Sequence, residues 1–206
     1  MRIRQLTIAT GDLEGQAAFY GERCGLPVGR DGDAVEVRLR DSTIRFEPAE
    51  PGLDARYHFA INVPRDSIRA AVAWLRERAE PLTFDGDPVR TDVGAGCVYF
   101  LDAAGNVVEL IASPHVEGGA GDFGPASLIE LAEIGVASAD PTATSVAVED
   151  AFGEGVRWSD SELTAVGDDH AVVIVAPIGR GWIPVDLTAR ALPTEVVGET
   201  GRFRVG

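Results

Sequence analysis

One pattern that occurs three times in this chain limits the folds open to it. In each copy a polar residue opens a short run rich in β-branched residues, and an acidic residue that can start a helix follows seven or eight positions later. The leading and acidic residues are Gln5 and Asp12, His58 and Asp66, and Glu133 and Asp140. This repeat predicts three copies of a strand–helix unit. Strands that repeat in this way can bring polar side chains from distant parts of the sequence to one cleft.

The first copy predicts one helix and at least three strands. Behind Asp12, apolar residues at helical spacing predict a helix of about three turns, and Gly25 stands where that helix would end. Apolar and polar residues then alternate over residues 35–39 and 43–47, which predicts a hairpin. A further short strand is predicted near Val28. The unit therefore has the order β-α-β-β, with one extra strand.

The second and third copies repeat this order with different regularity. In the second, an apolar stripe from Ile68 to Ala79 predicts a helix, and Cys97–Leu101 and Val107–Ile111 are predicted strands around a DAAGN turn. In the third, the helix pattern is weaker, but Leu163–Val166 and Ala171–Ala176 again predict a hairpin. We expect a first module at 1–53, a second at 54–115, a glycine-rich linker at 116–126, and a third, degenerate module with a tail at 127–206.

Composition and charge exclude several classes of protein. The chain has 206 residues, 45% of them hydrophobic, and a formal net charge of −15, which fits a folded protein and makes nucleic acid an improbable partner. No apolar run approaches the roughly 20 residues needed to cross a bilayer, and no signal peptide is evident, so we expect a cytoplasmic protein without a membrane partner. Cys24 and Cys97 are too few for a disulfide framework.

Three segments together resemble a known superfamily. They are QLTIATGDLEGQAAFYGERCGLPV, YHFAINVP and VYFLDAAGNVVELIA, and they resemble the glyoxalase, bleomycin-resistance and extradiol-dioxygenase proteins, the vicinal oxygen chelate superfamily. The resemblance covers roughly residues 3 to 113, with a fainter echo in 128 to 188. It implies an α+β fold in which paired βαβββ modules form a curved mixed sheet with helices on its convex side. It also implies a divalent metal on the concave face.

Carrying the ligands of that superfamily over to this chain gives an incomplete set. The resemblance implies Gln5, His58 and Glu109 as metal ligands. Internal alignment of NVVELI with STIRFE places Arg45 at the fourth position, and a guanidinium cannot bind a cation. Glu47, two residues on, could substitute as a ligand or act as a base, and Glu109 could also be the base. The metal would be Ni, Zn, Mn or Fe, unless Arg45 leaves the cleft metal-free.

Other residues receive roles from the same pattern. Arg45 and Arg38 could bind a carboxylate or phosphate of the substrate, although charged residues on a sheet face are more often simply solvated. The third unit carries Glu133 as its leader, but Val173 aligns with Glu109, so we expect no metal there. That unit would instead cover its open sheet by pairing with the same unit of another chain, giving a homodimer. We expect Trp158 and Trp182 to pack this unit rather than line a ligand site.

Two functions of different classes follow from these observations. The first is a glyoxalase-like, metal-dependent enzyme of the lyase, isomerase or dioxygenase type, which acts on a small vicinal-oxygen substrate. The second is a metal-free binding protein similar to the bleomycin-resistance proteins, which sequesters a cationic ligand. His58 and Glu109 favour the first, and Arg45 favours the second.

Overall fold

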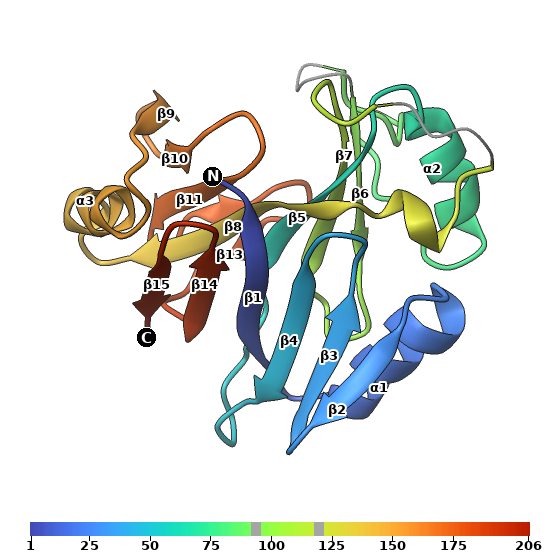
Figure 1. Cartoon of the computed structure of the whole chain (residues 1–206), viewed down its shortest axis with the longest axis horizontal. Helices are drawn as coiled ribbons and strands as arrows, with labels where there is room; N and C mark the ends of the chain where they lie inside the picture. The colour runs from blue at the N-terminus through green and yellow to red at the C-terminus, as the bar shows by residue number, and fades with distance from the viewer. Residues whose placement is uncertain (92–95, 118–121) are drawn as a thin grey trace.

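The computed structural model describes residues 1–91, 96–117 and 122–206. Three βαβββ-like units and a C-terminal segment make up the chain (Figure 1). The fold is α+β, with a curved mixed sheet and few helices, as the sequence predicted. The predicted linker at 116–126 lies partly outside the described residues. Among those residues, each helix is too short or too polar to cross a lipid bilayer.

The first unit contains the strands β1 (Ile3–Thr10), β2 (Val28–Asp31), β3 (Ala34–Arg38) and β4 (Thr43–Pro48). Its helix begins as α1 (Leu13–Ala17) and continues as the π-helical turn η1 (Ala18–Arg23). Asp12 caps it as predicted, because its Oδ1 accepts a hydrogen bond from the Gly15 amide at 2.8 Å. The short strand predicted near Val28 is present as β2.

The second unit contains β5 (His58–Pro64), α2 (Ile68–Arg76), β6 (Cys97–Leu101) and β7 (Val107–Ser113). The apolar stripe of α2 buries Val72, Trp74 and Leu75, which is why this helix was readable from its sequence. Asp66 does not cap it, since the N-cap position is Ser67.

The third unit is more complete than the sequence predicted. A 3₁₀ turn, η2 (Pro125–Ser127), leads into β8 (Glu130–Ser138), α3 (Pro141–Phe152), β9 (Val156–Ser159), β10 (Thr164–Gly167) and β11 (Val172–Pro177). Asp140 caps α3 by accepting from the Ala143 amide at 3.0 Å, and Gly153 ends it with a φ of 70°. The predicted hairpin is present as β10 and β11.

The C-terminal segment adds two hairpins that no periodicity in the sequence predicted. They comprise β12 (Gly181–Trp182), β13 (Leu187–Thr188), β14 (Thr194–Gly198) and β15 (Arg202–Val205). β14 pairs antiparallel with β1, so the C-terminal chain extends the sheet of the first unit. Figure 1 shows this dark red hairpin beside the dark blue β1.

The pairing of the units corrects one expectation. β8 of the third unit pairs antiparallel with β5 of the second, from Phe59↔Ile134 to Asn62↔Glu130. The third unit therefore finds its partner strand within the same chain. β1 touches β8 only at Ile3↔Leu131. The two leading strands that meet along their length are thus those of His58 and Glu133, not those of Gln5 and His58.

Two apolar clusters lie on opposite faces of this sheet. The larger, between sheet and helices, includes Phe59 and Ile61, and the smaller, on the other face, includes Ala60. Alternation along β5 explains the division, because successive side chains of a strand point to opposite faces. The smaller cluster is covered by Trp182, Leu187 and Ala189 of the C-terminal segment, and this cover makes a cavity possible.

Candidate metal centre

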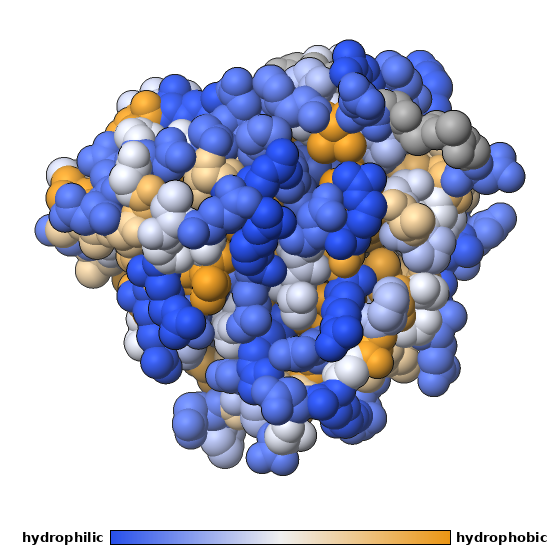
Figure 2. Space-filling model, viewed as in Figure 1, coloured by the Kyte–Doolittle hydropathy of each residue, from blue (hydrophilic) through white to orange (hydrophobic). Residues whose placement is uncertain are grey.

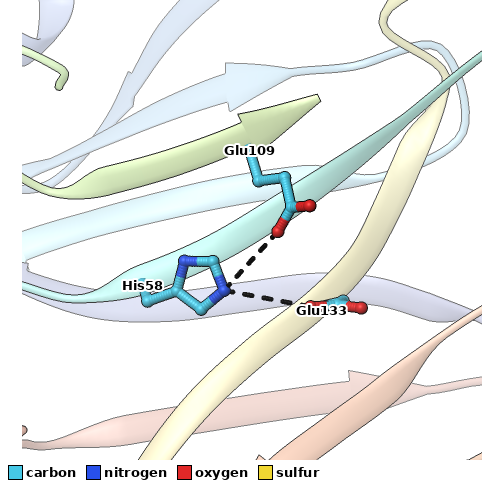
Figure 3. A group of neighbouring side chains, drawn as sticks. All are labelled: His58, Glu109 and Glu133. Atoms are coloured by element: carbon cyan, nitrogen blue, oxygen red, sulfur yellow. Dashed lines mark ion pairs between the residues drawn. The ribbon is translucent and has the colours of Figure 1, made fainter. Parts of the chain in front are cut away.

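Three neighbouring strands place His58, Glu109 and Glu133 together. In the strand register Ala60 of β5 is opposite Glu109 on β7 and also opposite Glu133 on β8. His58 precedes Ala60 by two positions and so shares its face. Neighbouring strands lie about 4.8 Å apart, so the three side chains converge on the side of the sheet to which Ala60 points. Figure 3 shows the two carboxylates directed toward the His58 ring.

A β-bulge helps to aim Glu133. The pairing of β5 with β8 shifts by one residue between Ala60 and Ile61, where Leu131 rather than Ala132 is opposite Ile61. Leu131 and Ile134 both belong to the larger core, whereas Ala132 belongs to the smaller one. The extra residue therefore lets Ala132 and Glu133 both lie on the cavity side of the sheet. Bulges are frequent next to functional sites because they redirect a side chain in this way.

The potential ligand atoms are close and well buried. One such atom from each of His58, Glu109 and Glu133 lies within 4.8 Å of the other two. His58 Nε2 is 3.8 Å from Glu109 Oε2 and 3.8 Å from Glu133 Oε2, and Figure 3 draws both ion pairs. These distances exceed a hydrogen bond. Glu109 is almost fully buried, whereas the Glu133 side chain is 19% exposed and so gives the site a path to solvent.

The pKa values of the site reflect opposing effects. Burial lowers the pKa of His58, but Glu133 and Glu109 outweigh it, so the His58 pKa is raised overall. Burial, followed by the charge of Glu133, raises the pKa of Glu109 to about 7, although His58 opposes this. Burial, together with Glu109, also raises the pKa of the Tyr99 hydroxyl and of the Cys97 thiol. Burial and mutual repulsion therefore make the two negative charges of Glu109 and Glu133 costly, and a cation bound between them would offset that cost.

The donor set fits a divalent cation. His58 Nδ1 is 3.2 Å from the Val107 carbonyl oxygen; a carbonyl only accepts, so Nδ1 carries the proton. In the neutral ring Nε2 then directs its lone pair toward two carboxylates, an arrangement that a proton or a metal ion must balance. Glu109 Oε1 is buried and has no hydrogen-bond partner among the described residues. An imidazole held by a backbone carbonyl beside two carboxylates is a typical ligand set for Zn, Mn, Fe or Ni.

A cavity of about 160 Å³ opens in front of these residues. Its polar wall contains the three site residues with Arg90 and Arg180, and its apolar wall includes Trp158, Ile174 and Trp182. A second hollow of about 440 Å³ shares Glu133 and Trp158 with it. We call the smaller cavity, with its wall of Trp158, Ile174 and Trp182, the aromatic chamber. The second hollow is a wider, more polar opening beside it.

Gln5 does not join His58 and Glu109, which corrects the expected ligand set. Gln5 lies on β1, which pairs with β4 and β14, and its Nε2 donates to Thr7 Oγ1 at 3.2 Å. Neither β1 nor β4 contributes to the cavity wall. The physical reason is that β5 pairs with β8 rather than with β1, a choice that the repeat alone could not reveal.

The residues expected around Gln5 are also remote from the cavity. Arg45 makes ion pairs with Asp31, Glu36 and Glu47 at 2.8–3.1 Å on the polar face of the first unit. Glu47 therefore neutralises Arg45 and is no base for the cluster. Arg38 is exposed on β3. Figure 2 shows a largely hydrophilic surface on the side of the molecule where β1, β3 and β4 lie in Figure 1.

The strand register confirms most of the internal alignment. Thr7↔Arg45 in the first unit corresponds to Ala60↔Glu109 in the second, so Arg45 does occupy the place of Glu109. In the third unit the equivalent pair is Gly135↔Ile174. Ile174, rather than Val173, is therefore the residue of the third unit that is equivalent to Glu109 of the second. Val173 lies on the other face of the sheet, in the larger core. The second and third units therefore supply His58 and Glu133 from their leading strands and Glu109 from the last strand of the second unit. The fourth position, on the last strand of the third unit, holds the apolar Ile174.

The aromatic residues of the third unit have a larger part than expected. Trp158 and Trp182 line the cavity, and the Trp182 ring centroid is 5.4 Å from that of His58. Trp182 also packs the unit as predicted: a Cβ on Gly135 would lie 2.6 Å from its ring. The GRGW sequence shows that an aromatic residue follows a turn, but only the fold shows that β12 returns over the site.

Comparison with known proteins supports the fold. Neither protein-family models nor curated protein sequences match the chain. Among solved structures, a proposed dioxygenase from Bacillus subtilis subsp. subtilis str. 168 is 16% identical over 100% of this chain and 67% of its own, with a TM-score of 0.57. A glyoxalase I mutant from Zea mays is 16% identical over 85% of this chain and 68% of its own, with a TM-score of 0.52.

The fold is therefore that of the vicinal oxygen chelate superfamily, and the resemblance inferred from the sequence is confirmed at this level. Proteins with this fold include a glyoxalase and a proposed dioxygenase. Identities this low show the fold and not the reaction. The chemistry of this chain must come from its own side chains.

Proposed function

We propose that this protein is a metal-dependent enzyme of the vicinal oxygen chelate type, which binds one divalent cation through His58, Glu109 and Glu133 and acts on a small substrate with two adjacent oxygen atoms. One observation carries the proposal: His58 Nε2 lies 3.8 Å from a carboxylate oxygen of Glu109 and of Glu133, and the three potential ligand atoms lie within 4.8 Å of one another. A facial set of three ligands leaves coordination positions open for substrate.

A cation held there would supply Lewis-acid chemistry to the adjacent oxygens. Side chains of the protein would transfer the proton and exclude water. Glu109, with a pKa raised to about 7, is suited to accept a proton from a substrate carbon at its Oε1 and to return it. Trp182 and Ile174 exclude water from this side of the site. Glu133 faces the wider opening, where the metal and the substrate would enter.

Metal analysis tests this proposal directly. Purified protein is stripped with a chelator, reconstituted separately with Ni, Zn, Mn and Fe(II), and analysed for metal per chain. We expect one equivalent in the wild-type protein. Glu133→Gln removes a charge at constant shape and His58→Ala removes the imidazole, so each should lower occupancy at least tenfold.

Two matched variants serve as controls. Glu47→Gln changes a carboxylate on the first unit, and His115→Ala removes a histidine outside the cluster, so both should keep full occupancy. Equal metal binding in Glu133→Gln and in the wild-type protein would overturn the ligand set. A wild-type protein that binds none of the four metals would favour the metal-free binding function instead.

A further inference from the structure

Arg180 gives the aromatic chamber a feature that metal binding does not explain. It lines the cavity with His58 and Glu109, its side chain is 17% exposed, and its guanidinium carbon lies 5.5 Å from the centre of the Trp182 ring. Trp182 in turn lies beside His58. One indole ring therefore separates the guanidinium from the imidazole of the metal centre.

The guanidinium retains unused hydrogen-bonding capacity. One terminal nitrogen donates to the Gly181 carbonyl oxygen at 2.8 Å. Nε is buried and makes no hydrogen bond to any described residue; it lies 3.5 Å from a carboxylate oxygen of Glu162, whose side chain is 62% exposed. An ion pair this exposed contributes little. A planar, permanently charged donor whose nearest carboxylate is this exposed Glu162 can exchange it for the carboxylate of a ligand.

The charge balance of the chamber also favours an anion. A divalent cation would neutralise Glu109 and Glu133, and the cavity wall also contains the guanidinium group of Arg180. The formal net charge of the chain is −15, so an anion gains nothing from the long-range field and depends on these local groups. The Arg180 guanidinium in the wall disfavours the cationic ligand expected for a drug-binding protein.

The size and lining of the chamber limit the body of the ligand. Its volume of about 160 Å³ is close to that of an engineered apolar cavity of about 150 Å³ that holds one benzene molecule. Trp158, Leu163 and Trp182 supply flat or branched apolar surface, which suits a single ring. A single ring therefore fills this chamber, and any further part of a ligand would extend into the wider hollow beside Glu133 and Trp158.

We propose that the substrate is a single-ring, or equally small, compound that carries two adjacent oxygens at one end and a carboxylate at the other, with Arg180 binding the carboxylate across Trp182 from the metal centre. This inference rests on the proposed function for the vicinal oxygens. Arg180 would contact the carboxylate and not the metal, so its contribution can also be measured in metal-free protein, as the change that Arg180→Gln makes to the preference for a carboxylate over a neutral ligand.

The first arm of the test uses protein from which metal has been removed with a chelator, together with ligands that cannot themselves chelate a metal. Binding of benzoate and of the neutral benzamide is followed by quenching of tryptophan fluorescence and by calorimetry. Benzoate should bind more tightly than benzamide to the wild-type protein. Arg180→Gln should weaken benzoate about tenfold or more, as expected for a lost charge-assisted hydrogen bond, and should change benzamide less than twofold.

Two further variants keep this arm interpretable. Arg180→Lys keeps the charge without the planar fork and should retain part of the preference for benzoate. Arg69→Gln, an exposed position on α2, should behave as the wild-type protein. Benzamide binding as tightly as benzoate, or benzoate affinity unchanged in Arg180→Gln, would overturn the role of Arg180.

The second arm uses metal-loaded protein with catechol and 3,4-dihydroxybenzoate. In the wild-type protein 3,4-dihydroxybenzoate should bind about tenfold more tightly than catechol, and Arg180→Gln should abolish that difference. Glu133→Gln should weaken both dihydroxy ligands and leave benzoate discrimination in the first arm intact. If metal does not tighten the binding of catechol to the wild-type protein, the proposed function is contradicted. If the wild-type protein does not prefer benzoate over benzamide, the role of Arg180 is contradicted.

Discussion

Ala60 is the residue that makes room for the site, although it supplies no ligand. It lies opposite both Glu109 and Glu133 and is fully buried. A larger side chain at this position would occupy the space in which the three ligand atoms converge. Gly135 has a similar role on β8, because the Trp182 ring rests where its Cβ would be. Small residues at two cross-strand positions therefore determine the shape of the chamber.

We predict that Gly135→Ala displaces Trp182. The new Cβ would lie 2.6 Å from the indole ring, and such overpacking costs about 1–3 kcal/mol. The change should be measured by chemical denaturation and by tryptophan fluorescence. Gly155→Ala is the matched control, since Gly155 is exposed and a Cβ there meets nothing within 4 Å. Equal stability of the two variants would contradict the close packing of Trp182.

The pKa values of His58 and Glu109 predict how stability depends on pH. Both are raised above their ordinary values in the folded chain, so both groups bind protons more tightly when the protein is folded. Their contribution is present at low pH; that of Glu109 is lost as pH rises through about 7, and that of His58 is lost as pH rises through its raised pKa. The Tm of metal-free protein should therefore fall between pH 5 and pH 8, as measured by calorimetry.

Glu109→Gln provides the control for this pH effect. It removes the titrating carboxylate, so the fall in Tm between pH 5 and pH 8 should become smaller. Added metal competes with protons for the same groups, and its stabilising effect should be larger at pH 8 than at pH 5. A metal-induced rise in Tm that is larger at pH 5 would contradict the ligand assignment.

At the scale of elements, the DAAGN turn joins two units through the buried Asp102. Its carboxylate accepts hydrogen bonds from Gln16 Nε2 at 2.7 Å, from the Tyr20 hydroxyl at 3.0 Å, and from Asn106 Nδ2 at 2.8 Å. The first two donors belong to α1 and η1 of the first unit. This turn therefore connects the helix of the first unit to the strands that carry the site.

We predict that Asp102→Ala destabilises the whole chain. It leaves three buried donors without an acceptor, and such a loss should lower the free energy of unfolding by about 3 kcal/mol or more. Urea denaturation measures the change. Asp33→Asn, at an exposed turn position, should change it by less than about 0.5 kcal/mol. A similar effect of both variants would show that the network contributes nothing.

At the scale of the whole molecule, the second and third units build the candidate site together within one chain. The first unit and the C-terminal hairpin β14–β15 form a separate polar sheet face, on which Gln5 and Arg45 lie. The pairing of β5 with β8 removes the reason for expecting the third unit to need another chain. A homodimer stays a prediction, to be checked by light scattering at micromolar concentration.

We predict one metal ion per chain, whether the protein is a monomer or a dimer. All three proposed ligands come from the same chain, so metal content should not change when the protein is diluted. Metal analysis combined with light scattering over a range of concentrations measures this. Half an equivalent per chain, or metal lost on dilution in step with dissociation, would show that two chains share the ion.

The local units of this protein were predictable from the sequence, because periodicity and helix caps depend on neighbouring residues. Asp12 and Asp140 cap their helices as predicted, and His58 and Glu109 lie near each other as expected from one unit, since β5 and β7 pair within it. Which units meet could not be predicted in this way. Gln5 and Glu133 both lead strands and look alike in the repeat, but pairing between distant strands depends on the packing of the whole sheet, and that packing brought Glu133 to His58. Arg180 and Trp182 entered the site by the same route, on a hairpin whose position no local pattern encodes.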